Sequence, residues 1–131
     1  MLAELKATNE ELLEALDALD TLTAEPEPDL AGMAAARLKL GKAGSQRRRV
    51  VDAACNLLVE TLPSDEARKL RGLREINAAQ LEAWSAHVGA WELPQLTADW
   101  PGYCRASAPI RQSLRDLLAS DDETLYPLLG G

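Results

Sequence analysis

The chain is poor in the residues that most often carry chemistry. It has no phenylalanine, only three tryptophans and two tyrosines, two cysteines and a single histidine among 131 residues. One histidine leaves little material for an imidazole metal site or for nucleophilic catalysis assisted by a histidine base. No glycine-rich phosphate loop is present either. We find no catalytic constellation in the sequence, expect no enzymatic activity and expect no cofactor.

Long hydrophobic runs and a basic overall charge are also missing. No run of 18 apolar residues occurs, so we expect no membrane span and no membrane partner. The N-terminus lacks the basic start and unbroken apolar stretch of a signal peptide, which predicts a cytoplasmic protein. The net charge of −7 argues against nucleic acid as a partner, because phosphates require a basic surface.

Charge is unevenly distributed along the chain. Residues 1–30 carry nine acids and one base, whereas residues 37–49 carry six bases and no acid. Exposed charge runs usually belong to solvated faces, and here two neighbouring helices of opposite charge would face each other. The alternative is that residues 37–49 form a basic docking patch for an acidic partner.

The abundant residues are leucine and alanine, and they recur at helical spacing. This pattern, with few β-branched residues, predicts an all-α protein. Helices are expected over residues 2–23, 29–62, 64–91 and 100–128, with proline-containing breaks between them. A separate short helix beginning at Ser120 is an alternative reading of the C-terminal part. Four such helices predict one domain over residues 1–131, an up-down-up-down four-helix bundle.

Polar residues interrupt three of the apolar seams at inward positions. These residues are Asn9, Asn77 and Asp121. The register of residues 29–62 is less well defined, and the one that we favour directs these side chains inward: Met33, Ala36, Leu40, Ala43, Arg47, Val50, Ala54 and Leu57. A buried carboxylate without a partner is costly, so we predict that Asp121 accepts a hydrogen bond from at least one of Asn9, Asn77 and Arg47, with Arg47 as the favoured donor. In the rival arrangement Arg47 points to solvent and Asp121 lies near the surface.

Three segments resemble parts of a known family. Residues 124–129 (TLYPLL) close the last helix as in a hemerythrin-like (HHE cation-binding) domain, and residues 100–104 (WPGYC) and 57–62 (LLVETL) are similar to its other helix ends. The resemblance spans nearly the whole chain and implies a four-helix bundle. Active members of this family hold two irons with histidine and carboxylate ligands, for oxygen binding or iron sensing.

The ligand positions of that family are altered in this chain. They fall on Asn9, Val50, Ala54, Asn77, Leu117 and Asp121. Only Asp121 retains a side chain typical of an iron ligand, and one carboxylate cannot hold two irons. The resemblance therefore implies the fold without the metal, with Asn9, Arg47, Asn77 and Asp121 as a polar cluster in the vacated site.

Our interpretation is a metal-free, non-enzymatic binding or regulatory module whose partner is an unknown protein or small molecule. One alternative is a small-molecule sensor or carrier that uses the vacated centre of the bundle. A weaker one is a residual metal-binding protein. Self-association through tryptophan-bearing faces is a further alternative.

The remaining distinctive side chains are expected to be structural. His87 has no second ligand at suitable spacing, so we expect it to face solvent or to be hydrogen-bonded. Trp84 and Trp91 are expected to pack in the core, with a ligand-stacking wall as the alternative. Cys55 and Cys104 should lie roughly 27 Å apart along the bundle and therefore stay unpaired.

Overall fold

The structure is a computed structural model that describes residues 1–130. Within this range it is almost entirely helical and contains no strand, which confirms the predicted all-α class. The helices are α1 (Leu2–Thr23), α2 (Leu30–Val59), α3 (Ser64–Ala90), α4 (Leu93–Ala98) and α5 (Trp100–Gly130). None of them combines the length and the apolar composition needed to cross a bilayer.

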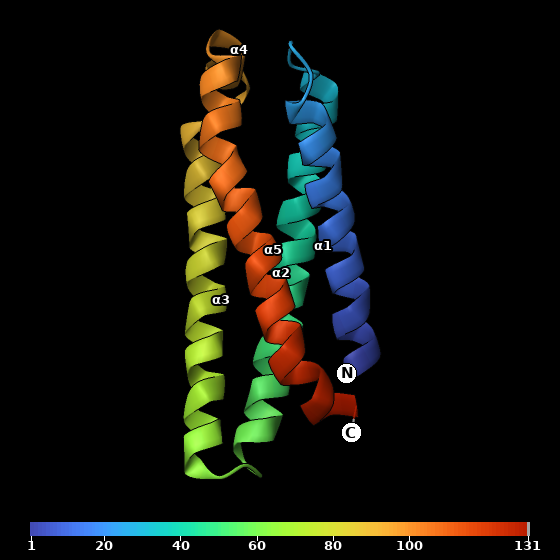
Figure 1. The fold of residues 1–131 in the computed structure, drawn as a ribbon, viewed down its shortest axis with the longest axis vertical. Helices are drawn as coiled ribbons and strands as arrows, with labels where there is room; N and C mark the ends of the chain where they lie inside the picture. Colours follow the sequence, from blue (N-terminus) through green and yellow to red (C-terminus); the bar gives the residue numbers. More distant parts are fainter. Residues whose placement is uncertain (131) are drawn as a thin grey trace.

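The four long helices lie side by side along the long axis of the molecule, and successive long helices run in opposite directions (Figure 1). α1 and α3 each pack against both α2 and α5. The short α4 lies at the end of the molecule where the chain turns from α3 into α5 (Figure 1). The chain ends meet at the opposite end, where a Cβ added to Gly130 would lie 2.6 Å from Leu2 Cδ2.

Local sequence signals explain most helix boundaries. The Asp29 carboxylate caps α2 by accepting a hydrogen bond from the Gly32 backbone N–H at 3.0 Å, and Asp99 does the same for Gly102 at the start of α5. The sequence did not predict α4, because Pro94 was interpreted as a break. Proline is tolerated in the first turn of a helix, and here it stands at the start of α4.

One other boundary differs from the prediction, because α2 ends at Val59 rather than at residue 62. The single helix predicted over residues 100–128 is present as α5, which continues through Pro109 and Pro127 to Gly130, so the alternative of a separate helix beginning at Ser120 is wrong. Figure 1 shows that the last turns of α5 bend away from its main axis.

The favoured register of α2 is confirmed from Met33 to Arg47 and at Ala54, but it is wrong at Val50 and Leu57. Val50 is only partly buried and Leu57 is 56% exposed, while Val51 and Cys55 are fully buried in their place. An α-helix repeats every 3.6 residues, so Met33 and Val51, eighteen residues apart, point in the same direction after about five turns. The predicted stripe alternates steps of three and four residues, so it drifts relative to the 3.6-residue repeat and has left the centre of the buried face at Val50 and Leu57.

The same displacement occurs on α5. The spacing of three and four along residues 100–128 predicts Ile110 and Leu117 in the core, but both are only partly buried, and the next residues, Arg111 and Leu118, are buried instead. The fully buried α5 residues nevertheless include Asp121, as predicted.

The core consists of two apolar clusters. The larger cluster lies toward α4 and contains the buried tryptophans Trp84 and Trp100 together with Tyr103, and the partly buried Trp91 packs against it. The smaller cluster lies toward the chain ends and contains Leu5, Val51, Cys55, Leu70, Leu73 and Leu125. Core packing is thus confirmed for Trp84. Trp84 and Trp100 are 3% and 6% exposed, so most of each ring is enclosed within the molecule.

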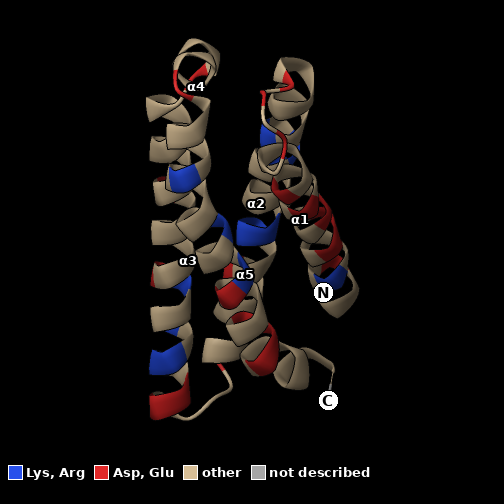
Figure 2. Ribbon diagram, turned by 45° about the horizontal axis from the view of Figure 1, so that its top comes forward, with Lys and Arg blue, Asp and Glu red and all other residues tan. Residues whose placement is uncertain are grey.

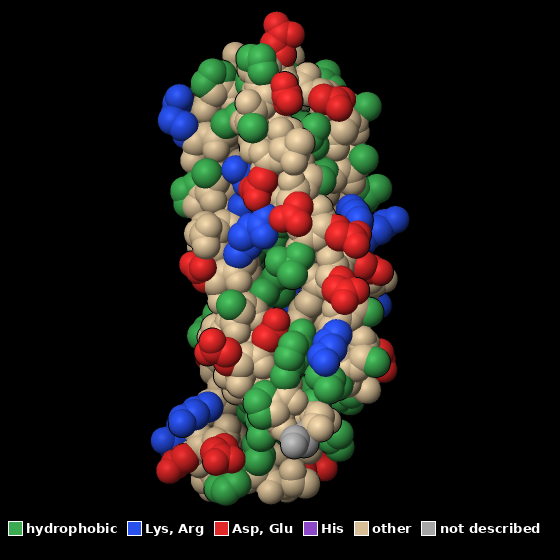
Figure 3. Space-filling model, turned by 45° about the vertical axis from the view of Figure 1, so that its right-hand side comes forward, with side chains coloured by type: hydrophobic (Ala, Val, Ile, Leu, Met, Phe, Trp, Pro, Cys, Tyr) green, Lys and Arg blue, Asp and Glu red, His purple; other side chains and the backbone are tan. Residues whose placement is uncertain are grey.

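Opposite charges connect α1 to its neighbours. Figure 2 shows acidic positions along α1 and basic positions on α2. Lys39 lies 2.8 Å from Glu14, so part of the basic stretch does face the acidic helix. On the other side of α1, Arg115 lies 2.8 Å from Asp17, and acidic and basic side chains intermingle on this face (Figure 3). Such exposed pairs contribute about 0.2–1 kcal/mol each.

Candidate functional site

A layer of buried polar side chains separates the two apolar clusters. Each long helix contributes one member: Asn9 from α1, Arg47 from α2, Asn77 from α3 and Asp121 from α5, and all are at most 6% exposed. On every one of these helices the polar residue stands between a residue of the larger cluster and one of the smaller. We call these four residues the polar centre.

Arg47 is the hub of the polar centre. Its Nε donates to Asn9 Oδ1 at 2.5 Å, its Nη1 donates to Asn77 Oδ1 at 2.6 Å, and its Nη2 donates to Asp121 Oδ2 at 3.0 Å. Each of the three guanidinium nitrogens therefore has an acceptor on a different helix. The planar fork of arginine suits this arrangement because its donors point outward in one plane.

The side-chain amides of Asn9 and Asn77 extend the hydrogen-bond network beyond Arg47. Asn77 Nδ2 donates to Asp121 Oδ2 at 2.7 Å and to the Leu73 carbonyl oxygen at 2.8 Å. Asn9 Nδ2 donates to Asp122 Oδ1 at 2.7 Å and to Tyr126 Oη at 2.8 Å. Both asparagines thus accept from the guanidinium and donate to acidic groups on α5, so the network joins all four long helices.

Burial and pairing act in opposite directions on the central carboxylate. Burial raises the pKa of Asp121, and the hydrogen bond from Asn77 and the positive charge of Arg47 counteract that rise. Burial likewise raises the pKa of Asp122, again opposed by Arg47. Arg47 therefore offsets part of the desolvation of two neighbouring carboxyl groups.

The sequence located the polar centre but not its outer members. The predicted contact between Arg47 and Asp121 is present, and the rival arrangement with Arg47 in solvent is wrong. Asp122 and Tyr126 were missed as members of the network. Tyr126 belongs to the TLYPLL segment that carries the family resemblance, but its contact with Asn9, 117 positions away in the sequence, is visible only in the structure.

The residues at the polar centre do not fit a di-iron site. Two of the family's ligand positions fall on Val50 and Ala54, which are apolar, and Leu117 is a third. The one carboxylate of the centre, Asp121, is already paired with a guanidinium. Across residues 1–130, no three His, Cys, Asp or Glu side chains gather closely enough to hold a metal ion.

A small cavity adjoins the polar centre. It has a volume of about 30 Å³, and Arg47, Asn77, Trp84 and Leu118 are among the residues that line it. A cavity of this size has room for water and is about a tenth of the smallest usual ligand pocket.

His87 belongs to a second buried polar group, nearer α4. It is 7% exposed, so the expectation that it faces solvent is wrong, and its Nε2 has no partner among the described residues. Its ring stacks on Tyr103 with centroids 5.5 Å apart. Burial lowers the pKa of His87, and the positive charges of Arg37 and Arg111 lower it further. The imidazole is therefore kept neutral between two guanidinium groups.

Arg37, which lies beside His87, connects α2 to the end of α3. Its Nη2 donates to the Val88 carbonyl oxygen at 2.9 Å, and its guanidinium carbon lies 5.9 Å from the centroid of the Tyr103 ring. Val88 is in the last turn of α3, where carbonyl groups have no partner inside the helix. Arg37 therefore caps the C-terminal end of α3 and brings positive charge to the negative end of its dipole.

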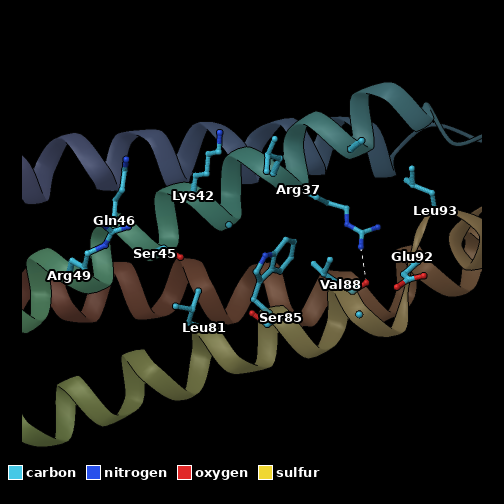
Figure 4. Close-up of a pocket in the computed structure, with 15 residues that line it drawn as sticks. Arg37, Lys42, Ser45, Gln46, Arg49, Leu81, Ser85, Val88, Glu92 and Leu93 are labelled. Carbon is cyan, nitrogen blue, oxygen red and sulfur yellow. Dashed lines mark hydrogen bonds between the residues drawn. The ribbon is translucent and has the colours of Figure 1, made fainter.

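A groove of about 910 Å³ lies between α2 and α3, on the side of the molecule shown in Figure 4. Its apolar lining includes Leu38, Leu81, Trp84, Val88 and Leu93. Leu38 is 60% exposed and Leu93 is 37% exposed, so part of this apolar surface faces water.

The rims of the groove are polar, and α2 supplies its cations. Arg37, Lys42 and Arg49 line it from α2, and Glu92 is its one acid. In Figure 4 Arg37 reaches across toward Val88 on α3, whereas Lys42 extends outward from the rim. The basic stretch over residues 37–49 is visible in the sequence, but only the structure shows that part of it borders an apolar groove.

Comparison of the chain with protein-family models, with curated proteins and with solved structures finds no match. The likeness to hemerythrin-like domains therefore rests on the residues of this chain alone.

Proposed function

We propose that the chain is an up-down-up-down four-helix bundle of the hemerythrin-like type that has exchanged its metal site for Arg47 and acts as a non-enzymatic binding or regulatory module. The observation that carries this proposal is the guanidinium at the polar centre, hydrogen-bonded to side chains of α1, α3 and α5. A guanidinium is permanently charged, so it gives Asp121 the positive partner that iron gives a carboxylate ligand.

Electrostatics favour this reading over residual metal binding. A metal cation at the polar centre would be close to the fixed positive charge of Arg47, and the repulsion between like charges is strong where water is excluded. The available donors are two amide groups and one carboxylate that is already engaged. That donor set is unlike the several imidazoles and carboxylates of di-iron bundles.

The titratable groups give little support for an enzyme. Burial raises the pKa of the Cys55 thiol to about 11 and also raises that of Cys104. Both shifts disfavour the thiolate, which is the nucleophilic form. The one histidine is enclosed among aromatic rings.

The size of the central cavity favours a surface site over a small-molecule carrier. About 30 Å³ beside Arg47 is too small for an organic ligand, whereas the groove between α2 and α3 is within the range of binding sites. Binding is therefore expected on the outside of the helices.

Metal reconstitution tests the first half of the proposal. The whole chain is incubated anaerobically with Fe(II), exposed to air, desalted and analysed for iron and for visible absorption. We expect no stoichiometric iron and no rise in Tm, because a ligand that binds the folded state must stabilise it. Two irons per chain with an oxo-bridge absorption band would contradict the proposal.

Photo-cross-linking tests the second half. A photoreactive residue is placed in the whole chain at Glu10 on α1, at Gly41 on α2 or at Arg68 on α3, and the protein is irradiated in the cells that make it. At least one position should give a discrete adduct with another protein. If adducts are absent from all three faces, the chain is not a protein-binding module.

A further inference from the structure

We propose that the groove between α2 and α3 binds an amphipathic α-helix of a partner protein that carries acidic residues beside its apolar stripe. This inference rests on the proposed function as a binding module, and it names the surface and the chemistry of the partner.

The dimensions of the groove suit one helix. Its α2 wall extends from Ala34 to Arg49, which is about 22 Å at 1.5 Å per residue, or roughly four turns. Its other wall comes from α3, so a helix laid in the groove would contact two helices at once. This is the geometry in which an amphipathic helix places its apolar face in a hydrophobic groove.

The exposed apolar anchors lie in the half of the groove toward α4. Leu38 and Leu93 are exposed, and the Trp84 ring and Leu81 lie between α2 and α3. Exposed apolar side chains grouped in a hollow mark interaction sites more often than isolated ones do. Leucines spaced three and four residues apart on the partner would reach these positions from one helix face.

The charge of the occupant follows from which α2 bases are already paired. Four of the six bases in residues 37–49 already have partners within the chain. Arg37 donates to the Val88 carbonyl oxygen and Lys39 pairs with Glu14. Arg47 belongs to the polar centre, and Arg48 pairs with Asp52. Lys42 and Arg49 form no ion pair within residues 1–130, and both line the groove. A chain with a net charge of −7 that keeps two unpaired cations beside an apolar groove favours an acidic partner there.

The same charges predict an orientation. Glu92 is the one acid of the groove and lies at its α4 end, while Arg49 lies at the other end. The acidic residues of the bound helix should therefore lie toward Arg49, and its end near Glu92 should be neutral or basic.

Two glycines allow the groove to be filled without disturbing the core. A Cβ added at Gly41 or at Gly89 would meet no atom within 4 Å, and both positions line the groove. Gly72 on α3 has the same open space outside the groove and provides a matched control.

Peptide selection against the whole chain tests the inference. A phage-displayed library of helices about 15 residues long keeps leucines at helical spacing and varies the flanking positions among Glu, Gln and Lys. We expect selected peptides to be enriched in Glu over Lys. Their binding should weaken about tenfold or more in Gly41→Leu, and should change less than about twofold in Gly72→Leu.

Charge reversal provides a second variant that does not depend on filling the groove. Lys42→Glu with Arg49→Glu should weaken binding of the selected peptide by about tenfold or more. The matched control is Arg68→Glu with Lys69→Glu, which makes the same charge change at exposed positions of α3 and should have little effect. Circular dichroism of every variant checks that the helices remain folded.

The outcomes separate this inference from the proposed function. Selected peptides that lack an acidic bias, or that bind Gly41→Leu as well as the wild type, would place the binding surface elsewhere and overturn the groove assignment while leaving a binding module intact. Enrichment of no peptide, or binding only to phosphatidylserine vesicles, would also overturn it. The proposed function fails separately, through iron uptake or the absence of cross-linked partners.

Discussion

Arg47 Nη2 lies 3.0 Å from Asp121 Oδ2, and the two side chains are 3% and 4% exposed. The pair joins α2 to α5 at the level where apolar packing is interrupted on all four long helices. Withdrawing two charges from water costs several kcal/mol per ion, so a buried pair is stable only when its other hydrogen bonds are also made. Here Asn9 and Asn77 accept the remaining guanidinium bonds.

Replacing the central arginine should leave a buried charge without a partner. We expect Arg47→Ala to lower the free energy of unfolding by about 3–5 kcal/mol, measured by urea denaturation at pH 7. Lys39→Ala is the control, because it removes a single exposed ion pair, with Glu14, and should cost at most about 1 kcal/mol. A loss below about 0.5 kcal/mol for Arg47→Ala would mean that the network does not stabilise the fold.

Removing both charges should be less harmful than removing one. In Arg47→Met with Asp121→Leu no charge remains among the four residues of the polar centre, which becomes more like the apolar clusters on either side. The double variant should therefore unfold at a higher urea concentration than Arg47→Ala. The amides of Asn9 and Asn77 lose the guanidinium donor in both variants. Only the double variant also removes the Asp121 acceptor of Asn77 Nδ2, which keeps its hydrogen bond to the Leu73 carbonyl oxygen. A double variant less stable than Arg47→Ala would contradict this expectation, because it would show that the unpaired Asp121 carboxylate is not the main cost of losing Arg47.

Most of the polar centre could be predicted because polar residues are rare at the inward positions of an apolar helix stripe. Asn9, Asn77 and Asp121 each occupy a position where leucine would be expected, and the 3.6-residue repeat is sufficient to place them inside. The surroundings of His87 were not predictable in this way. Its burial depends on Arg37 and Tyr103, which come from two other helices, and no local pattern links residues so distant in sequence.

The groove could not be predicted from the sequence either, because it too depends on contacts between helices. The basic stretch was visible, but which of its members are paired depends on contacts of α2 with α1 and α3. The register error at Val50 has a different origin. In a helix rich in alanine and glycine the apolar stripe is weak, so Val50 and Val51 are equally acceptable to a pattern of three and four.

The buried histidine should make stability depend on pH. Its pKa is lowered in the folded state by burial and by Arg37 and Arg111, so the unfolded chain binds a proton at a higher pH than the folded one. The stability linked to this group is present above pH 6.5 and is lost as the pH falls through the folded-state pKa.

The measurement is urea denaturation of the wild type and of His87→Phe at pH values from 8 to 5. On acidification below pH 6.5 the wild type should lose stability relative to the variant. The raised pKa values of Asp121 and Asp122 act in the opposite direction, because the folded state then binds protons more readily, but they are common to both proteins and cancel in the difference. If the stabilities of the wild type and of His87→Phe change in parallel with pH, the pKa of His87 is not lowered in the folded state.

The two thiols should react at very different rates. The structure has both cysteines free, with Cys55 buried in the smaller apolar cluster and Cys104 only partly buried, as the predicted separation required. With a pKa of about 11, roughly one Cys55 thiol in a thousand is ionised at pH 8, and its burial also excludes reagent. A thiol-specific reagent such as DTNB should therefore modify Cys104 first and Cys55 only when the end of the molecule near the chain termini opens. In Cys104→Ser the remaining thiol should be slow in the native state and rapid in denaturant, and Arg47→Ala should accelerate it because the polar centre adjoins that cluster. Two thiols that react at the same fast rate in the native wild type would contradict the burial of Cys55.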